Sequence, residues 1–231
     1  MSSEPFTVLV VCTGNLNRSA LGAALLRTWA GWYLPAGLAR EVRVVSAGLA
    51  APGGRPMRTR TRVIAEALGA EGADHRATQI TESAVASADL VLVASREQVD
   101  SVLGLAPSAL RSTFTIREAG RIAEGLGDPS VPASVDDLRA RVAKLREHRA
   151  PSGTAGGDDI VDPQGKAEDA YIEMARQEVP ALGRLASVLF GMPRAEVAAY
   201  EAAVEAADYD FDGSGIGIVA ADARPRGRRQ A

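Results

Sequence analysis

The sequence predicts an α/β fold, a three-layer αβα sandwich in which helices cover both faces of a four-stranded parallel sheet. Two observations predict it. Short apolar, β-branched runs at residues 6–11 (FTVLVV) and 90–93 (LVLV) lack a polar face, which is typical of strands buried on both sides of a parallel sheet. Stretches with apolar residues at helical spacing separate these runs, so that strands and helices alternate along the chain.

Each expected element follows from local pattern. The first strand is followed by a polar loop and then by a stretch with Leu21, Leu25 and Trp29 on one helical face. A long amphipathic helix near the end carries Ile172, Leu182 and further apolar residues at the same spacing. We expect strands at 6–11, 42–46, 90–93 and 113–116, and helices at 19–33, 57–68, 96–103, 135–149, 166–190 and 193–207.

The density of glycine and proline rises between residues 119 and 157. We interpret this stretch as an insertion in a domain that covers 1–192, followed at 193–231 by a C-terminal helix and a flexible tail. The helix expected inside the insertion is basic, and we expect its charged side chains to form a solvated surface: Arg139, Arg141, Lys144, Arg146 and Arg149.

Composition narrows the functional classes. A net charge of −3 does not favour a nucleic-acid partner. A single cysteine excludes an internal disulfide and a four-cysteine zinc site, and we expect no metal and no cofactor. No apolar run approaches the roughly 18–20 residues of a membrane span. With no signal-peptide pattern at the N-terminus, we expect a cytoplasmic protein.

The most informative segment is residues 12–19 (CTGNLNRS), between the first strand and the first helix. Ligands bind at the carboxyl ends of parallel strands, and a helix N-terminus offers free N–H groups and positive charge to an anion. Arg18 adds a planar fork that matches two phosphate oxygens, and this positive environment favours the thiolate of Cys12. The segment therefore predicts a loop that binds phosphate or vanadate through Thr13, Gly14, Asn15, Leu16, Asn17 and Arg18.

These residues resemble the signature C-x-G-N-x-C-R-S of the low-molecular-weight protein tyrosine phosphatase family. Further landmarks follow in the family's order over about residues 1–118 and 158–190: Ser46-Ala47-Gly48, His75, Ala88-Asp89 and Asp162-Pro163. The segment SAGLAAPGGRP is similar to bacterial, exopolysaccharide-associated members.

The resemblance implies a phosphatase that acts on phosphotyrosine protein, a tyrosine kinase among the candidate partners, or on a similar aryl phosphate. Cys12 would be the nucleophile that forms a phosphocysteine, Arg18 would hold the phosphoryl oxygens, and Asp162 would be the general acid. It further implies that Ser19 donates a hydrogen bond to the thiolate. The loop would be braced by Asn15, Ser46 and His75.

Two Asp-Pro pairs compete for the role of the acid. Proline forces the preceding residue into extended backbone, so both Asp128 and Asp162 would project from a loop. Only Asp162 follows an apolar Ile-Val pair and leads into the last long helix, as the family pattern requires. We therefore favour Asp162.

The sequence also departs from the family. The second loop cysteine of many members is Asn17, and the aromatic residue after Asp-Pro is Gln164. Leu49 and two alanines stand where some members have an aromatic wall for the phenyl ring. These departures leave tyrosine selectivity open. A single-cysteine arsenate reductase using a small thiol and a non-catalytic phosphate-binding module remain as alternatives.

Overall fold

The computed structural model describes residues 4–127, 130–149 and 157–211. Its centre is one parallel sheet with the strand order β2-β1-β3-β4. The strands are β1 (Phe6–Cys12), β2 (Val42–Gly48), β3 (Leu90–Val93) and β4 (Thr113–Thr115). Val10 of β1 stands opposite Ser46 of β2 on one side and Leu92 of β3 on the other. The predicted sandwich with a four-stranded parallel sheet is confirmed.

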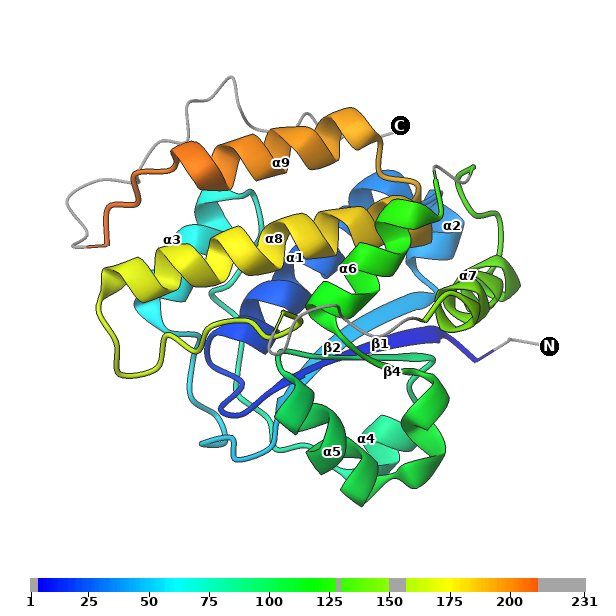
Figure 1. Cartoon of the computed structure of the whole chain (residues 1–231), viewed down its shortest axis with the longest axis horizontal. Helices are drawn as coiled ribbons and strands as arrows, with labels where there is room; N and C mark the ends of the chain where they lie inside the picture. Colours follow the sequence, from blue (N-terminus) through cyan, green and yellow to red (C-terminus); the bar gives the residue numbers. More distant parts are fainter. Residues whose placement is uncertain (1–3, 128–129, 150–156, 212–231) are drawn as a thin grey trace.

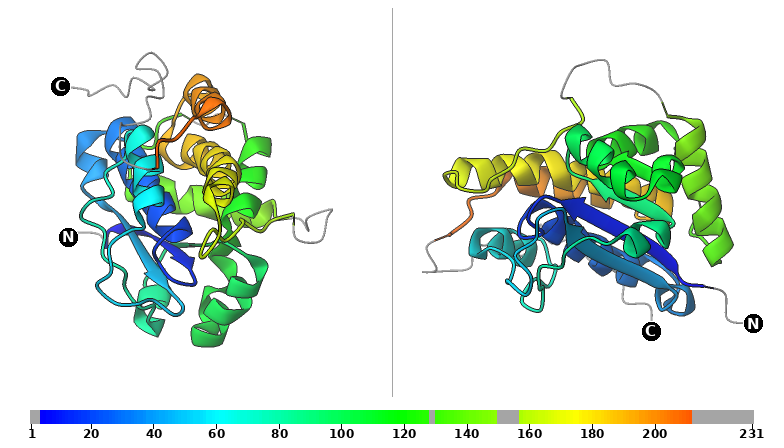
Figure 2. Two further views of the ribbon diagram at one scale, coloured as in Figure 1. Left: turned by 90° about the vertical axis from the view of Figure 1, so that its left-hand side faces the viewer. Right: turned by 90° about the horizontal axis from the view of Figure 1, so that it is seen from below.

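The sheet divides the apolar core in two, because successive side chains of a strand point to opposite faces. Val8 and Val10 belong to the larger half of the core, whereas Leu9 and Val11 belong to the smaller half. On the larger side lie α1 (Arg18–Tyr33), α3 (Thr59–Ala67), α6 (Ile116–Gly125), α7 (Val135–Glu147), α8 (Glu168–Phe190) and α9 (Arg194–Ala206). The other side is covered by α4 (Glu82–Ala86), α5 (Arg96–Leu105) and the 3-10 helix η1 (Pro107–Arg111), as Figures 1 and 2 show.

The short helix α2 (Ala36–Ala39) lies in the connection between α1 and β2. The sequence pattern did not predict α2, α4 or η1, which are each five residues or fewer. Elements of this length are too short to show a clear periodicity.

Helix α6 lies at the start of the stretch that the density of glycine and proline led us to interpret as an insertion. The strand expected at 113–116 ends at Thr115, because the Thr115 side chain and Glu118 form a reciprocal capping box that starts the helix. Gly120 then lies against α8, where a Cβ would come within 2.6 Å of the Ala181 carbonyl oxygen. The first part of the expected insertion is thus a core helix.

Helix α7 also differs from the expectation of a solvated basic face. Its apolar side, which includes Leu138 and Leu145, joins the core. Arg141 donates to the Val188 carbonyl at 2.7 Å, near the C-terminus of α8, where a cation is favourable. Arg139 pairs with Asp89 at 2.9 Å. These arginines therefore attach α7 to the domain.

Helix α9 packs on α8, and Tyr200 of α9 stands edge-on to Trp29 of α1 with ring centroids 4.9 Å apart. The larger core half therefore continues past residue 192. The expected division of the chain there stays a prediction, and the tail from 212 and Asp128-Pro129 lie outside the described residues.

Candidate active site

The phosphate loop, residues 12–18, joins β1 to α1 at the carboxyl edge of the sheet (Figure 1). Cys12 is the last residue of β1 and is buried, and its Sγ lies 3.0 Å from the Oγ of Ser19 in the first turn of α1. The Asn15 Nδ2 donates to the same Oγ at 2.9 Å. That oxygen accepts from Asn15, and its single hydrogen has two acceptors within reach, the sulfur at 3.0 Å and the Ala47 carbonyl oxygen at 3.4 Å.

Asn15 shapes the loop. Its φ of 52° lies in the left-handed region, which asparagine tolerates better than most residues. Its Oδ1 accepts from the Thr78 N–H at 2.9 Å, and its carbonyl oxygen lies 2.7 Å from His75 Nε2. These contacts, both from the segment 75–78, hold the strained conformation in place.

The His75 side chain is half buried beside the loop. Burial lowers the pKa of His75, and the hydrogen bond to the Asn15 carbonyl opposes this shift. A neutral imidazole that carries its hydrogen on Nε2 is a donor to that carbonyl. Neutral His75 therefore suits the observed contact.

Gly48 brings β2 against the loop. A Cβ at Gly48 would lie 2.7 Å from the Thr13 carbonyl oxygen and 2.9 Å from the Asn15 nitrogen, closer than real side chains come. The expected support from Ser46 stays a prediction. Among the described residues no side-chain hydrogen bond joins Ser46 to the loop, and the close approach is made by Gly48 at the end of the same strand.

Three further contacts of the loop were not predicted. Thr61 Oγ1 donates to Asn17 Oδ1 at 2.8 Å, and Gln98 Nε2 donates to Thr13 Oγ1 at 3.2 Å. The Arg58 N–H donates to the Leu16 carbonyl at 3.1 Å. The position of Gln98 in the sequence could have indicated this contact, because Gln98 lies in the first turn of the helix after β3, at the edge of the sheet where ligands bind. Thr61 had none.

Arg18 connects the phosphate loop to Asp162. The buried Arg18 guanidinium donates to the Ile160 carbonyl at 3.2 Å and to Asp162 Oδ2 at 2.5 Å. The Asp162 side chain is 42% exposed, and its other oxygen accepts from the Gln164 N–H at 3.0 Å. The structure thus brings Cys12, Arg18 and Asp162 to one place, although 144 residues separate the last two.

Two of the three departures from the family pattern, Asn17 and Gln164, lie next to each other. Asn17 Nδ2 and Gln164 Oε1 are 3.5 Å apart, at the long limit of a hydrogen bond. They join the phosphate loop to the acid loop, residues 158–165. An amide pair therefore occupies the place where the family pattern predicts a cysteine and an aromatic ring.

A second carboxyl group lies behind Arg18. Glu178 of α8 is fully buried, and neither of its oxygens has a hydrogen-bond partner among the described residues. Gly22 of α1 makes room for it, since a Cβ there would come within 2.7 Å of Oε1. Burial raises the pKa of Glu178 well above its ordinary value, and the smaller effects of the Arg18 charge and the Gly22 backbone oppose this.

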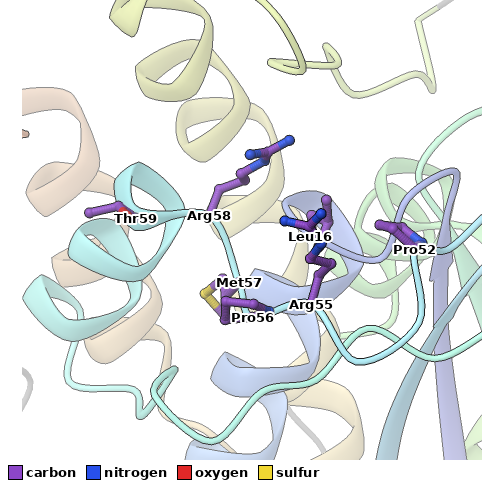
Figure 3. Close-up of a pocket in the computed structure, with 7 residues that line it drawn as sticks. All are labelled: Leu16, Pro52, Arg55, Pro56, Met57, Arg58 and Thr59. Atoms are coloured by element: carbon purple, nitrogen blue, oxygen red, sulfur yellow. The ribbon is translucent and has the colours of Figure 1, made fainter.

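A pocket of about 320 Å³ lies beside the phosphate loop (Figure 3). Leu16 of the loop forms one wall, and the rest comes from the segment after β2: Pro52, Arg55, Pro56, Met57, Arg58 and Thr59. The segment is hydrogen-bonded to the phosphate loop, from Leu49 N to the Cys12 carbonyl and from Ala50 N to the Thr13 carbonyl. Among the lining residues, the apolar Leu16 and Met57 are buried, whereas Arg55 and Arg58 are exposed at the rim.

Within the described part of the chain, no group of three or more His, Cys, Asp or Glu side chains is arranged to hold a metal ion. The same residues include no helix long and apolar enough to cross a membrane. What the site does offer is a thiol at the N-terminus of a helix, a buried guanidinium and a carboxylate. Together they can bind a phosphoryl group, attack it and protonate a leaving group.

The comparisons with known proteins agree with this geometry. The family model described as low molecular weight phosphotyrosine protein phosphatase matches residues 7–119. A protein from Ralstonia nicotianae, named probable low molecular weight protein-tyrosine-phosphatase EpsP, is 37% identical over 112 residues, 48% of this chain and 71% of the relative. A protein-arginine-phosphatase from Geobacillus stearothermophilus is 31% identical over 150 residues, 62% of this chain and 95% of the relative.

Solved structures show the same fold. The Erwinia amylovora tyrosine phosphatase AmsI superposes with a TM-score of 0.56 at 24% identity, over 81% of this chain and 95% of that one. The YwlE arginine phosphatase from Geobacillus stearothermophilus superposes with a TM-score of 0.55 at 28% identity, over 79% of this chain and 91% of that one. With relatives above 30% identity matched over most of their length, the chain belongs to the low molecular weight protein-tyrosine-phosphatase family of cysteine-based phosphatases.

Proposed function

We propose that the protein hydrolyses phosphotyrosine in proteins, or similar aryl phosphate monoesters, through a phosphocysteine intermediate. The observation that carries the proposal is the assembly of the Cys12 thiol, the Arg18 guanidinium and the Asp162 carboxylate around the N-terminus of α1. A site that only bound phosphate would have no use for an acid at this position.

The reaction proceeds in two steps. The Cys12 thiolate attacks phosphorus, the Sγ–P bond forms, and the bond from phosphorus to the phenolic oxygen breaks while Asp162 gives that oxygen its proton. A water molecule then attacks phosphorus and gives a proton to Asp162. The Sγ–P bond breaks, inorganic phosphate is released and the Cys12 thiolate is restored.

The loop stabilises the charge that spreads over the equatorial oxygens. The backbone N–H groups of residues 13–18 and the fork of Arg18 point at these oxygens. Ser19 donates to the thiolate, while Asn15 and His75 keep the loop in its strained shape. The phosphoryl group competes with Asp162 for Arg18, so that substrate binding frees the acid to face the leaving group.

The test is turnover of matched peptides that carry phosphotyrosine, phosphoserine or phosphoarginine, with mass spectrometry of the quenched enzyme to detect phosphate on Cys12. We expect phosphotyrosine turnover and phosphorylated Cys12. Arsenate with a small thiol, run in parallel, separates hydrolysis from the reductase activity that the single cysteine left open.

A second candidate activity is hydrolysis of phosphoarginine. The relative from Geobacillus stearothermophilus that carries this activity in its name is matched over nearly its whole length. Gln164 also offers no aromatic ring to a tyrosine. Against this candidate, the rim of the pocket carries Arg55 and Arg58, which repel a positively charged guanidinium. The same peptide panel decides between the two.

The proposed function is accompanied by expectations about the partner protein, the cellular location and the biological role. A phosphorylated protein partner such as a tyrosine kinase, a cytoplasmic location and a role in exopolysaccharide regulation all stay predictions. Incubation with candidate kinases in their tyrosine-phosphorylated form tests the first of these by loss of phosphotyrosine.

A further inference from the structure

The segment that lines the pocket contains four arginines within eight residues, 55–62 (RPMRTRTR). Two of them have carboxylate partners: Arg60 pairs with Glu168 at 2.9 Å and Arg62 with Glu66 at 3.1 Å. Arg55 and Arg58 are exposed, and neither side chain has a hydrogen-bond or ion-pair partner among the described residues. The two unpaired arginines are the two that line the pocket.

Hydrogen bonds hold the backbone at both arginines, and at Arg58 the bond is to the phosphate loop itself. The Arg58 N–H bonds to the Leu16 carbonyl, and the Arg55 carbonyl accepts from the Ala77 N–H at 2.8 Å. Figure 3 shows the Arg55 guanidinium beside Leu16 and the Arg58 side chain extending to the same side of the segment. Helix α3 begins at Thr59 without a side-chain cap, which adds free N–H groups at the pocket.

We propose that Arg55 and Arg58 form a second anion subsite, which binds an acidic group of the substrate protein close to the phosphorylated side chain. The proposal deepens the proposed function and rests on it. Arginine forks match carboxylate and phosphate alike, so that the second group is a neighbouring Asp or Glu or a second phosphorylated residue. The net charge of the chain is −3, so a basic rim at this place is a local feature.

The experiment compares kcat/KM for three phosphotyrosine peptides on the full-length enzyme. One peptide has acidic residues beside the phosphotyrosine, one has the amide counterparts, and one has a second phosphotyrosine beside neutral residues. For two exposed charge pairs we expect both anionic peptides to exceed the neutral one by about five- to tenfold at low salt, and less at high salt.

The variants are Arg55→Ala, Arg58→Ala and the double variant, and the readout is the ratio of each anionic peptide to the neutral one. We expect the double variant to bring this ratio close to one. Arg43→Ala is the matched control, since Arg43 is exposed near the amino end of β2, the opposite end from the loop, and the ratio should not change. Equal turnover of the three peptides by the unmodified enzyme, or a ratio that survives in the double variant, overturns the subsite.

Failure of the proposed function gives a different result, namely no turnover of any peptide. In that case the same peptides are titrated into the Cys12→Ser protein, with and without the two arginine substitutions. Tighter binding of the anionic peptides that depends on Arg55 and Arg58 supports the subsite, and its absence rejects it.

Discussion

The phosphate loop and the acid loop carry the two halves of the proposed chemistry, but the protein holds them in different ways. Side chains of α3 and α5, and the His75 side chain from the segment before α4, fix the phosphate loop. The acid loop is tied before Asp162. Asp159 accepts from the Arg96 N–H and from the Arg117 side chain, and the next two N–H groups donate to the Ala94 carbonyl and to the Gln177 side chain. Its carboxylate is half exposed and is held by Arg18 of the other loop.

This difference matches the two tasks of the loops in the proposed mechanism, which are anion binding by the phosphate loop and proton transfer by the acid loop. The anion-binding groups must be in place before substrate arrives, because pre-organised donors stabilise the transition state without a cost of reorganisation. The acid must instead reach different leaving groups. A carboxylate held by an exchangeable ion pair suits that task, since in the proposed mechanism the incoming phosphoryl group takes over the same guanidinium. The predictions below test this division.

The largest effect is expected at the nucleophile. Cys12→Ser should abolish turnover, because a serine hydroxyl at this position has no base to activate it. The loop keeps its other contacts, so the protein should remain folded and should still bind phosphate or vanadate. Turnover on an aryl phosphate, circular dichroism and calorimetric titration with phosphate measure the three outcomes. Substantial hydrolysis by this variant would contradict the phosphocysteine mechanism.

The next effect is expected at the acid. Asp162→Asn should lower kcat by roughly 10²–10⁴-fold for phosphotyrosine, the usual range for general acid–base catalysis. The loss should shrink for aryl phosphates whose leaving groups need no proton. The loss for phosphotyrosine and the smaller loss for the other aryl phosphates are both measured as kcat over a series of leaving groups.

Asp128→Asn is the matched control, since it changes the other Asp-Pro pair, and it should be nearly silent. If the two variants exchange their effects, the assignment of the acid is wrong. An equal loss for every leaving group would show that Asp162 acts by holding Arg18 rather than by giving a proton.

Most of the fold and the centre of the site were predictable from sequence, for a physical reason. The runs at 6–11 and 90–93 lack a polar face, which is typical of strands in a parallel sheet that helices cover on both sides. Cys12 and Arg18 lie in a loop whose ends are fixed by a strand and a helix. Asp162 was found through a resemblance, since nothing local in the sequence relates it to a residue 144 positions away.

The rest depends on contacts that have no local pattern. Thr61 and Glu178 sit on amphipathic helices, and only the packing of those helices brings them to Asn17 and Arg18. Glycine and proline near residue 119 suggested an irregular insertion. The capping box at Thr115 overrides that signal, and Gly120 instead allows α6 and α8 to approach closely.

A smaller loss is expected where β2 touches the phosphate loop. Gly48→Ala places a Cβ against two backbone atoms of the loop, so the loop must shift. A misplacement of this kind can cost up to about 10²-fold in kcat/KM. Gly53→Ala in the following segment is the control, because a Cβ there meets nothing within 4 Å. Equal kinetics for the two variants would show that the loop tolerates displacement and is not the rigid half of the site.

The smallest effect on chemistry, and a clear one on stability, is expected at Glu178, which lies behind the arginine that both loops share. Its pKa is raised in the folded protein by burial. Below the ordinary Glu value of about 4.3 both states are protonated and the contribution to stability is complete. As the pH rises toward the raised pKa, the unfolded state ionises first and binds fewer protons. Stability then falls by up to about 1.4 kcal/mol for each pH unit.

Glu178→Gln removes this titration. The free energy of unfolding is measured by denaturant titration for both proteins. As the pH rises from 4 to 7, the value for the variant should increase relative to that of the unmodified protein. The difference between the two proteins is the readout, because other titrating groups cancel in it. Glu71→Gln, at an exposed position, is the matched control. Since Glu178 touches no reacting atom, kcat at neutral pH should change by less than about tenfold, far less than for Asp162→Asn. A flat difference for Glu178→Gln would show that the carboxyl is ionised in the folded protein, paired with Arg18, and that Arg18 is then held from behind as well as by Asp162.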